Sequence, residues 1–191
     1  MLADHGPWNS WDRIPYITDV FDTEPDTLPP LKPKGKASVV PAWRHIRRNF
    51  IMSVYASQEA IDTDDGSAYY QTYENFFAFA ANGLKSDFNG HDNRHFRNVY
   101  AYVDNCWGFG DKNWFVNNTC VANSPDGGFK SDCTKRDMEN YGNTIYNQKG
   151  QLKNEKICDK SNKVEVTPSD DAIITLGAKA IGWTPGKPPM H

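Results

Sequence analysis

The chain has no long apolar run, few strong helix formers and no C-x-x-C cysteine pair. None of its 191 residues belongs to an uninterrupted apolar stretch of about 18 residues, so we expect no membrane partner. Glu occurs only 6 times against 18 Asp and 17 Asn, and such an excess of turn formers argues against an all-helical bundle. Without C-x-x-C, neither a zinc ribbon nor a thioredoxin-type motif is expected.

Basic blocks are scarce as well. The formal net charge is −3, and residues 44–48 form the single basic block, so we expect no nucleic-acid partner.

The four cysteines allow two disulfides or none. Cys133 and Cys158 are one repeat apart and would bridge adjacent coils in an oxidising compartment, whereas Cys120 is expected to face the core.

Self-similarity at 20 to 26 residues is the main positive signal. Residues 83–87 (Gly-Leu-Lys-Ser-Asp) recur as residues 128–132 (Gly-Phe-Lys-Ser-Asp). An asparagine also opens an apolar stretch five times with steps of 26, 23, 20 and 25, at Asn49, Asn75, Asn98, Asn118 and Asn143. That spacing matches one coil of a solenoid. We interpret these asparagines as turn residues that stack between coils.

The stretches after the asparagines are rich in aromatic and β-branched residues and too short for helices, so they indicate strands. They cover residues 50–54, 76–79, 99–103, 119–121 and 144–146. No amphipathic helix separates them, which excludes βαβ units. With these repeats and Asn-rich turns, residues 46–158 resemble the right-handed parallel β-helix proteins of the pectate-lyase-like type. The resemblance implies an all-β, right-handed parallel β-helix of five to six coils with one C-terminal helix.

The chain ends differ from this repeat region. We expect the β-helix over residues 1–166, with a Pro-rich excursion at 21–42, and a helix and tail over 167–191 that pack on the solenoid. Ser169 as N-cap, Asp170 and Asp171 in the first turn and Gly182 after the last turn bound that helix. An open first coil exposes strand edges, so we expect an N-terminal partner or a preceding segment to cover it.

A second ladder assigns residues to the outer face. We take Ile61, Leu84, Phe109 and Phe129 as inward-facing. Strand alternation then places two rows outside: Asp62, Lys85, Gly110 and Lys130, and Asp64, Asp87, Lys112 and Asp132. Stacked coils are about 4.8 Å apart, so Asp64 and Asp87 need a neutralising partner. Either Lys85 pairs diagonally with Asp62 and Asp64 in a solvated charge ladder, or Asp62, Asp64 and Asp87 bind Ca²⁺ through oxygen ligands.

Likeness to β-helix proteins with charged outer faces implies action on an acidic, uronate-containing polysaccharide, as a lyase or C5-epimerase. In that chemistry a cation neutralises the substrate carboxylate and a base removes the C5 proton. Lys85 is the expected base, with His91 and Arg94 as alternatives. Expected substrate-binding residues are Lys130, Asp132, His95 and Arg97. We expect an extracellular or secretory location, which the glycosylation sequon at 117–119 suits although no signal peptide is visible.

Two other functions remain open. Residues 63–66 (Thr-Asp-Asp-Gly) and 89–91 (Asn-Gly-His) partly resemble the Asp-Asp and Gly-His-Gly motifs of polygalacturonases, which implies a glycoside hydrolase. No Arg-Ile-Lys motif follows them. The other alternative is a non-catalytic solenoid with a glycan-binding or structural role. His91 and His95 lie four residues apart, but we expect no helix there and therefore no zinc pair.

Overall fold

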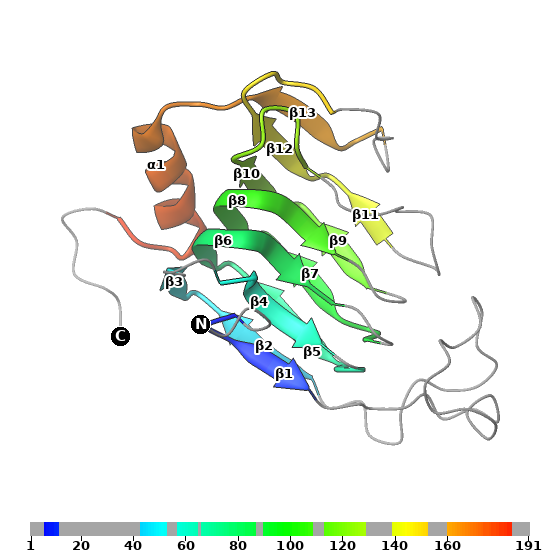
Figure 1. Cartoon of the computed structure of the whole chain (residues 1–191). Helices are drawn as coiled ribbons and strands as arrows, with labels where there is room; N and C mark the ends of the chain where they lie inside the picture. The colour runs from blue at the N-terminus through cyan, green and yellow to red at the C-terminus, as the bar shows by residue number, and fades with distance from the viewer. Residues whose placement is uncertain are drawn as a thin grey trace.

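A computed structural model of the chain describes residues 6–11, 43–52, 57–64, 66–86, 90–108, 113–128, 139–152 and 160–184. These residues form an all-β parallel solenoid of about four turns with one C-terminal helix (Figure 1). The fold class is as predicted, whereas the expected five to six coils are too many. In the described part, β1 (Asn9–Trp11) adds a single strand beside its neighbour rather than a further coil.

The strands belong to two parallel sheets. The large sheet has the order β1-β4-β6-β8-β10-β12-β13, with β3 beside β6. Its further members are β3 (Phe50–Met52), β4 (Glu59–Asp64), β6 (Phe76–Lys85), β8 (Val99–Gly108), β10 (Thr119–Ala122), β12 (Thr144–Asn147) and β13 (Lys163–Val166). The small sheet has the order β11-β9-β7-β5-β2. It consists of β2 (Arg44–Arg47), β5 (Tyr70–Tyr73), β7 (Arg94–Phe96), β9 (Trp114–Val116) and β11 (Glu139–Tyr141).

The two longest strands each have two arms. Strand β3 pairs with residues 76–78 of β6, and β4 pairs with residues 82–85 of the same strand. Between the arms Phe79 adopts a left-handed φ of 61°, and Tyr102 adopts 59° at the equivalent point of β8. The two rings stack with centroids 5.0 Å apart. A full coil therefore has three sides, one from the small sheet and two from the arms of the large sheet.

The asparagine ladder lies where the chain passes from the small sheet to the large one. The backbone N–H and Nδ2 of Asn98 both donate to Oδ1 of Asn118, at 3.0 and 3.1 Å. The same pattern joins each consecutive pair of Asn49, Asn75, Asn98, Asn118, Asn143 and Asn162. The predicted stacking of the first five is confirmed. Asn162 is a sixth member that the sequence reading missed, because its step of 19 is shorter than the others.

A left-handed residue precedes each of the first five ladder asparagines. Arg48, Glu74, Arg97 and Asn117 have φ of 55–56°, and Gly142 has 68°. At Gly142 a Cβ atom would overlap the amide of Asn117 in the neighbouring coil, so glycine fits there best. The repeated conformation gives the chain the sharp corner between sheets, and it points the residue's side chain away from the interior.

Apolar side chains and one disulfide fill the interior. The core contains Ile61, Phe77, Leu84, Tyr100, Phe115 and Ile145, all fully buried. Cys106 and Cys120 form a disulfide inside this core, with Cα atoms 5.7 Å apart. The core position predicted for Cys120 is thus confirmed. Its bridge to Cys106 was not foreseen, because their separation of 14 residues is not one repeat. Cys133 and Cys158 lie outside the described residues.

The predicted second ladder is only partly correct. Ile61 pairs with Leu84 as expected, but Leu84 pairs with Trp107 rather than Phe109. Lys85 consequently pairs with Gly108 instead of Gly110. The step from Leu84 to Trp107 equals the step of 23 from Asn75 to Asn98 in the same turns of the solenoid. Phe109 is 25 positions after Leu84 in the sequence, so it comes two residues after Trp107, which pairs with Leu84. Phe129 lies outside the described residues.

Helix α1 (Asp170–Ala180) packs on the outside of the solenoid, against β6 and β8 (Figure 1). Its predicted limits are confirmed: the Ser169 side chain accepts a hydrogen bond from the N–H of Ala172, and Gly182 follows with φ 72°. The buried Ile173 lies among outward side chains of the strands, namely Phe76, Ala78, Val99, Ala101 and Val121. No helix in the described part is long and apolar enough to cross a membrane.

The docking of α1 depends on Gly177. A Cβ atom at this position would overlap the ring of Phe76 on β6. In an isolated helix, Gly177→Ala would stabilise by about 1 kcal/mol. We expect the opposite here: a lower melting temperature in thermal unfolding, because the helix must move off the sheet. Thr175→Ala, on the exposed side of α1, is the control. A stabilising Gly177→Ala would show that α1 does not pack this closely.

Candidate functional site

Four charged side chains meet on β4 and β6, and we call Glu59, Asp62, Asp64 and Lys85 the acid–lysine cluster. Glu59 and Asp62 are fully buried, and Asp64 and Lys85 are each 9% exposed. Lys85 Nζ lies 2.9 Å from Asp64 Oδ2. Parallel pairing explains the juxtaposition, since Asp62 pairs with Lys85 in the next coil. The cluster holds three carboxyl groups against one ammonium, so it carries more negative than positive groups.

Asp62 occupies the centre of this arrangement. Strand β1 pairs with β4 so that Asn9 lies beside Asp62, and Asn9 Nδ2 donates to Asp62 Oδ2 at 2.8 Å. The other carboxylate oxygen, Oδ1, is buried and has no hydrogen-bond partner among the described residues. An ionised carboxylate in this position would lack part of the solvation that it has in water.

Burial is the main reason why the pKa of Asp62 rises from its ordinary 3.8 to about 7. The positive charge of Lys85 opposes this rise, while the neighbouring Asp64 and Glu59 carboxylates add to it. The hydrogen bond from Asn9 acts in the same direction as Lys85. Asp62 is therefore a carboxyl group that gains and loses its proton close to neutral pH, unlike an ordinary surface aspartate.

A hydroxyl network adjoins the cluster and was not foreseen from the sequence. The N–H of Ser67 donates to the backbone carbonyl of Asp64 at 3.0 Å. The Ser67 hydroxyl lies 2.7 Å from that of Ser10, and Ser10 donates to the hydroxyl of Tyr70 at 2.7 Å. Single serines carry no spacing signal, and Ser10 reaches the network only because β1 pairs with β4.

Three of the described site residues that the sequence predicts meet in the acid–lysine cluster. The structure brings Asp62, Asp64 and Lys85 together, and the predicted diagonal pairing is present between Lys85 and Asp64. His91 is 1% exposed, forms a bridge with Ala68, and has its Nδ1 2.8 Å from Asp92 Oδ2. Three other predicted residues, Asp87, Lys130 and Asp132, lie outside the described residues.

Arg94, His95 and Arg97 belong to the small sheet or to the turn after it, not to the acid–lysine cluster. His95 points into the solenoid, where it is fully buried and stacks on Phe115 with centroids 5.4 Å apart. Burial lowers the pKa of His95 to about 3, so the ring is neutral at physiological pH. Arg94 and Arg97 lie on the outside of the sheet.

The acid–lysine cluster is a poor match for a calcium site as far as its described residues go. Lys85 already neutralises Asp64, and the Asn9 amide occupies one carboxylate oxygen of Asp62. Among the described residues, no three His, Cys, Asp or Glu side chains are grouped so as to hold a metal ion. The calcium prediction thus depends on Asp87, outside the described part, and stays a prediction.

Comparison with protein-family models, with curated proteins and with solved structures finds no match to this chain. The fold and the side-chain chemistry of the acid–lysine cluster are therefore the basis for its function.

Proposed function

We propose that this protein acts on an acidic, uronate-containing polysaccharide as a lyase or C5-epimerase, with the acid–lysine cluster as its reaction centre. One observation carries the proposal: a fully buried carboxyl group, Asp62, has a pKa of about 7 beside a lysine. A general acid or base works best when its pKa is near the working pH. Burying three carboxyl groups together costs stability, and such arrangements concentrate at functional sites.

Two further features support the choice of substrate and compartment. The parallel solenoid is the architecture of the pectate-lyase-like β-helix proteins that the repeats resemble, and it offers an elongated surface for a polymer. The disulfide between Cys106 and Cys120 fits an oxidising compartment, because disulfides persist mainly in secreted proteins. An extracellular or secretory location suits a protein that meets polysaccharides.

The residues take the following roles in the proposal. Lys85 is held as a cation by Asp64, so we assign it to the substrate carboxylate, whose charge it neutralises, rather than to proton removal. Asp62 in its ionised form accepts the C5 proton. The electron pair of the C5–H bond then forms a C4=C5 double bond while the C4–O glycosidic bond breaks, and the leaving oxygen takes up a proton. In an epimerase, the C4–O bond stays intact and a second proton donor on the opposite face of C5, such as water, protonates that face instead.

The test is an assay of the protein on polygalacturonate and alginate, with calcium and separately with EDTA. A lyase produces unsaturated ends that absorb in the ultraviolet. An epimerase in D₂O incorporates deuterium at C5, which NMR detects. Neither signal on either polymer would contradict the proposal. New reducing ends without ultraviolet absorbance would favour the glycoside hydrolase instead.

A further inference from the structure

The outer face of the small sheet is a separate surface rich in arginine and aromatic side chains, and we call it the arginine–aromatic face. Its side chains alternate along the strands with inward residues such as Thr72, His95 and Phe115. Two rows cross the strands on the outside. They are His45, Gln71, Arg94, Trp114 and Glu139, and Arg47, Tyr73, Phe96, Val116 and Tyr141.

Positive charge is concentrated on this side of an acidic protein. The chain has 7 arginines at a net charge of −3. Five of them, Arg44, Arg47, Arg48, Arg94 and Arg97, belong to β2, to β7 or to the turn that follows each strand. Parallel pairing through β5 keeps these two strands on one sheet, and neighbouring strands lie about 4.8 Å apart. Arg47, Arg48, Arg94 and Arg97 thus form a compact cationic region, whereas Arg44 alternates with the outward His45 and contacts the Tyr70 ring instead.

Arg94 is the arginine best prepared to bind a ligand. Its guanidinium lies between two indole rings, 4.3 Å from the centroid of Trp43 and 4.3 Å from that of Trp114. It forms no ion pair with a described carboxylate. Stacking on both faces fixes the guanidinium plane but leaves its N–H edge available for a carboxylate. The side chain is therefore ordered before a ligand arrives, which lowers the entropy cost of binding.

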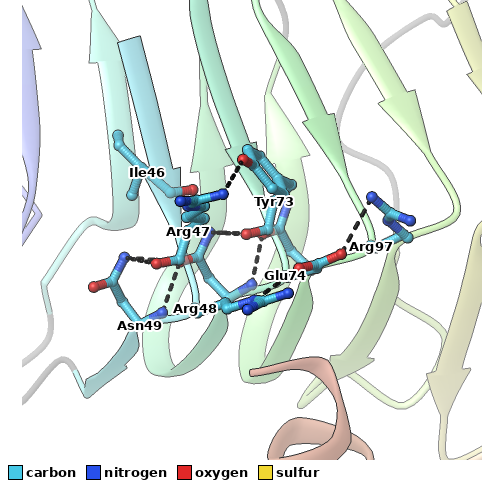
Figure 2. Close-up of polar contacts among 9 residues, drawn as sticks. Ile46, Arg47, Arg48, Asn49, Tyr73, Glu74 and Arg97 are labelled. Carbon is cyan, nitrogen blue, oxygen red and sulfur yellow. Dashed lines mark hydrogen bonds and ion pairs between the residues drawn. The ribbon is translucent and has the colours of Figure 1, made fainter. Parts of the chain in front are cut away.

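Neighbouring arginines are also held in place (Figure 2). Arg47 donates to the Tyr73 hydroxyl at 3.3 Å, and Glu74 lies between Arg48 at 3.1 Å and Arg97 at 3.2 Å. Two guanidinium groups share this one carboxylate, so the group of three keeps a net positive charge. It marks the edge of the arginine–aromatic face at the corner of the coil.

Other side chains cover faces of the aromatic rings on this surface, so these faces are not open platforms. Tyr73 and Phe96 stack with centroids 4.8 Å apart and an interplanar angle of 3°, so their facing π surfaces cover each other. The Arg97 guanidinium also lies over the Phe96 ring, 5.2 Å from its centroid. An anionic chain suits such a surface better than a neutral sugar ring that needs an open aromatic face.

We propose that the arginine–aromatic face binds an acidic polysaccharide along the solenoid axis, away from the acid–lysine cluster, with Arg94 as the principal carboxylate contact. The identity of the polymer rests on the proposed function. The binding itself does not, because it depends on cations on a different sheet from Asp62 and Lys85.

The test measures binding of polygalacturonate by isothermal titration calorimetry in an Asp62→Asn background, so that turnover does not consume the polymer. We expect Arg94→Gln to weaken binding about tenfold at low salt and to reduce its salt dependence. Arg94→Lys should recover part of the affinity, since charge is kept and the planar fork is lost. Lys149→Gln is the control, because Lys149 is an exposed cation paired with Asp126. Equal losses for Arg94→Gln and Lys149→Gln would overturn the proposal, as would equal binding of neutral dextran.

Arg47→Gln is a second test of the arginine–aromatic face, which remains usable if Arg94→Gln fails to fold. Arg47 is exposed on the edge strand β2, so its loss should weaken binding without unfolding the chain. The experiments can reject the proposed reaction and the proposed binding face independently of each other. Binding without any turnover by the unaltered protein retains the arginine–aromatic face and rejects the reaction. Turnover combined with unchanged binding by Arg94→Gln and Arg47→Gln rejects the face and retains the reaction.

Discussion

Asp62→Asn should lower turnover of a uronate polymer by 10²- to 10⁴-fold, the range expected when a general base is removed. The amide is similar in size and can still accept the hydrogen bond from Asn9, but it cannot take the C5 proton. Initial rates across pH should reveal the same residue: activity of the unaltered protein rises as Asp62 ionises, with an apparent pKa of about 7. Any activity left in Asp62→Asn should lack this rise.

The same substitution changes how stability depends on pH. The pKa of Asp62 is about 7 in the folded chain, against 3.8 for an ordinary aspartate, so the folded state binds more protons between these values. Protonation of Asp62 therefore favours the folded state. This contribution to stability is fully present below pH 4 and is lost as the pH rises through 7. This trend is the reverse of that for a salt-bridged carboxylate. Thermal unfolding of Asp62→Asn should show less decline over this window.

Asp126→Asn is the matched control for both measurements. Asp126 pairs with Lys149 near the surface, so its loss should leave turnover and the pH dependence of stability close to those of the unaltered protein. If Asp62→Asn kept full activity, Asp62 would not be the base. If the pH dependence of unfolding were unchanged, the carboxyl group would not be desolvated as the structure indicates.

Asn98→Ala should cost about 3–5 kcal/mol of unfolding free energy, the largest stability loss that we expect from a single ladder residue. Asn98 is 1% exposed. Its Nδ2 donates to the carbonyl of Thr72 at 2.8 Å, and its Oδ1 accepts from the N–H of Asn75 at 3.1 Å. Alanine removes both of these hydrogen bonds at a buried position, and a buried group left without a partner costs about 1–3 kcal/mol. Urea denaturation measures the loss.

Asn49→Ala provides the comparison within the same ladder. Asn49 is exposed at the first rung, and its backbone N–H would still donate to Asn75 after the substitution. Water can replace the lost side-chain bonds, so we expect a cost below about 1 kcal/mol. Similar losses for Asn49→Ala and Asn98→Ala would indicate that the ladder's hydrogen bonds, rather than their burial, determine its contribution.

Predictions from the sequence were most reliable where a signal repeats. The first five ladder asparagines share one backbone corner, so each copy reinforced the others, and the strands after them are at the predicted places. The C-terminal helix was equally clear, because Ser169 and Gly182 are local capping signals. By contrast, the predicted inward ladder was wrong by two residues at Phe109. Solenoid coils vary in length, and the bend at Tyr102 has no distinctive sequence signal.

Periodicity was enough to predict the solenoid, its asparagine turns and the approach of Asp62, Asp64 and Lys85. Which side chains are desolvated, and which meet across distant segments, follows from the folded chain. Burial raises the pKa of Asp62, while Lys85 and Asn9, a residue 53 positions away, oppose that rise. Arg94 gains its ordered guanidinium from Trp43 and Trp114, in different coils. These properties arise from packing between coils, which no local pattern specifies.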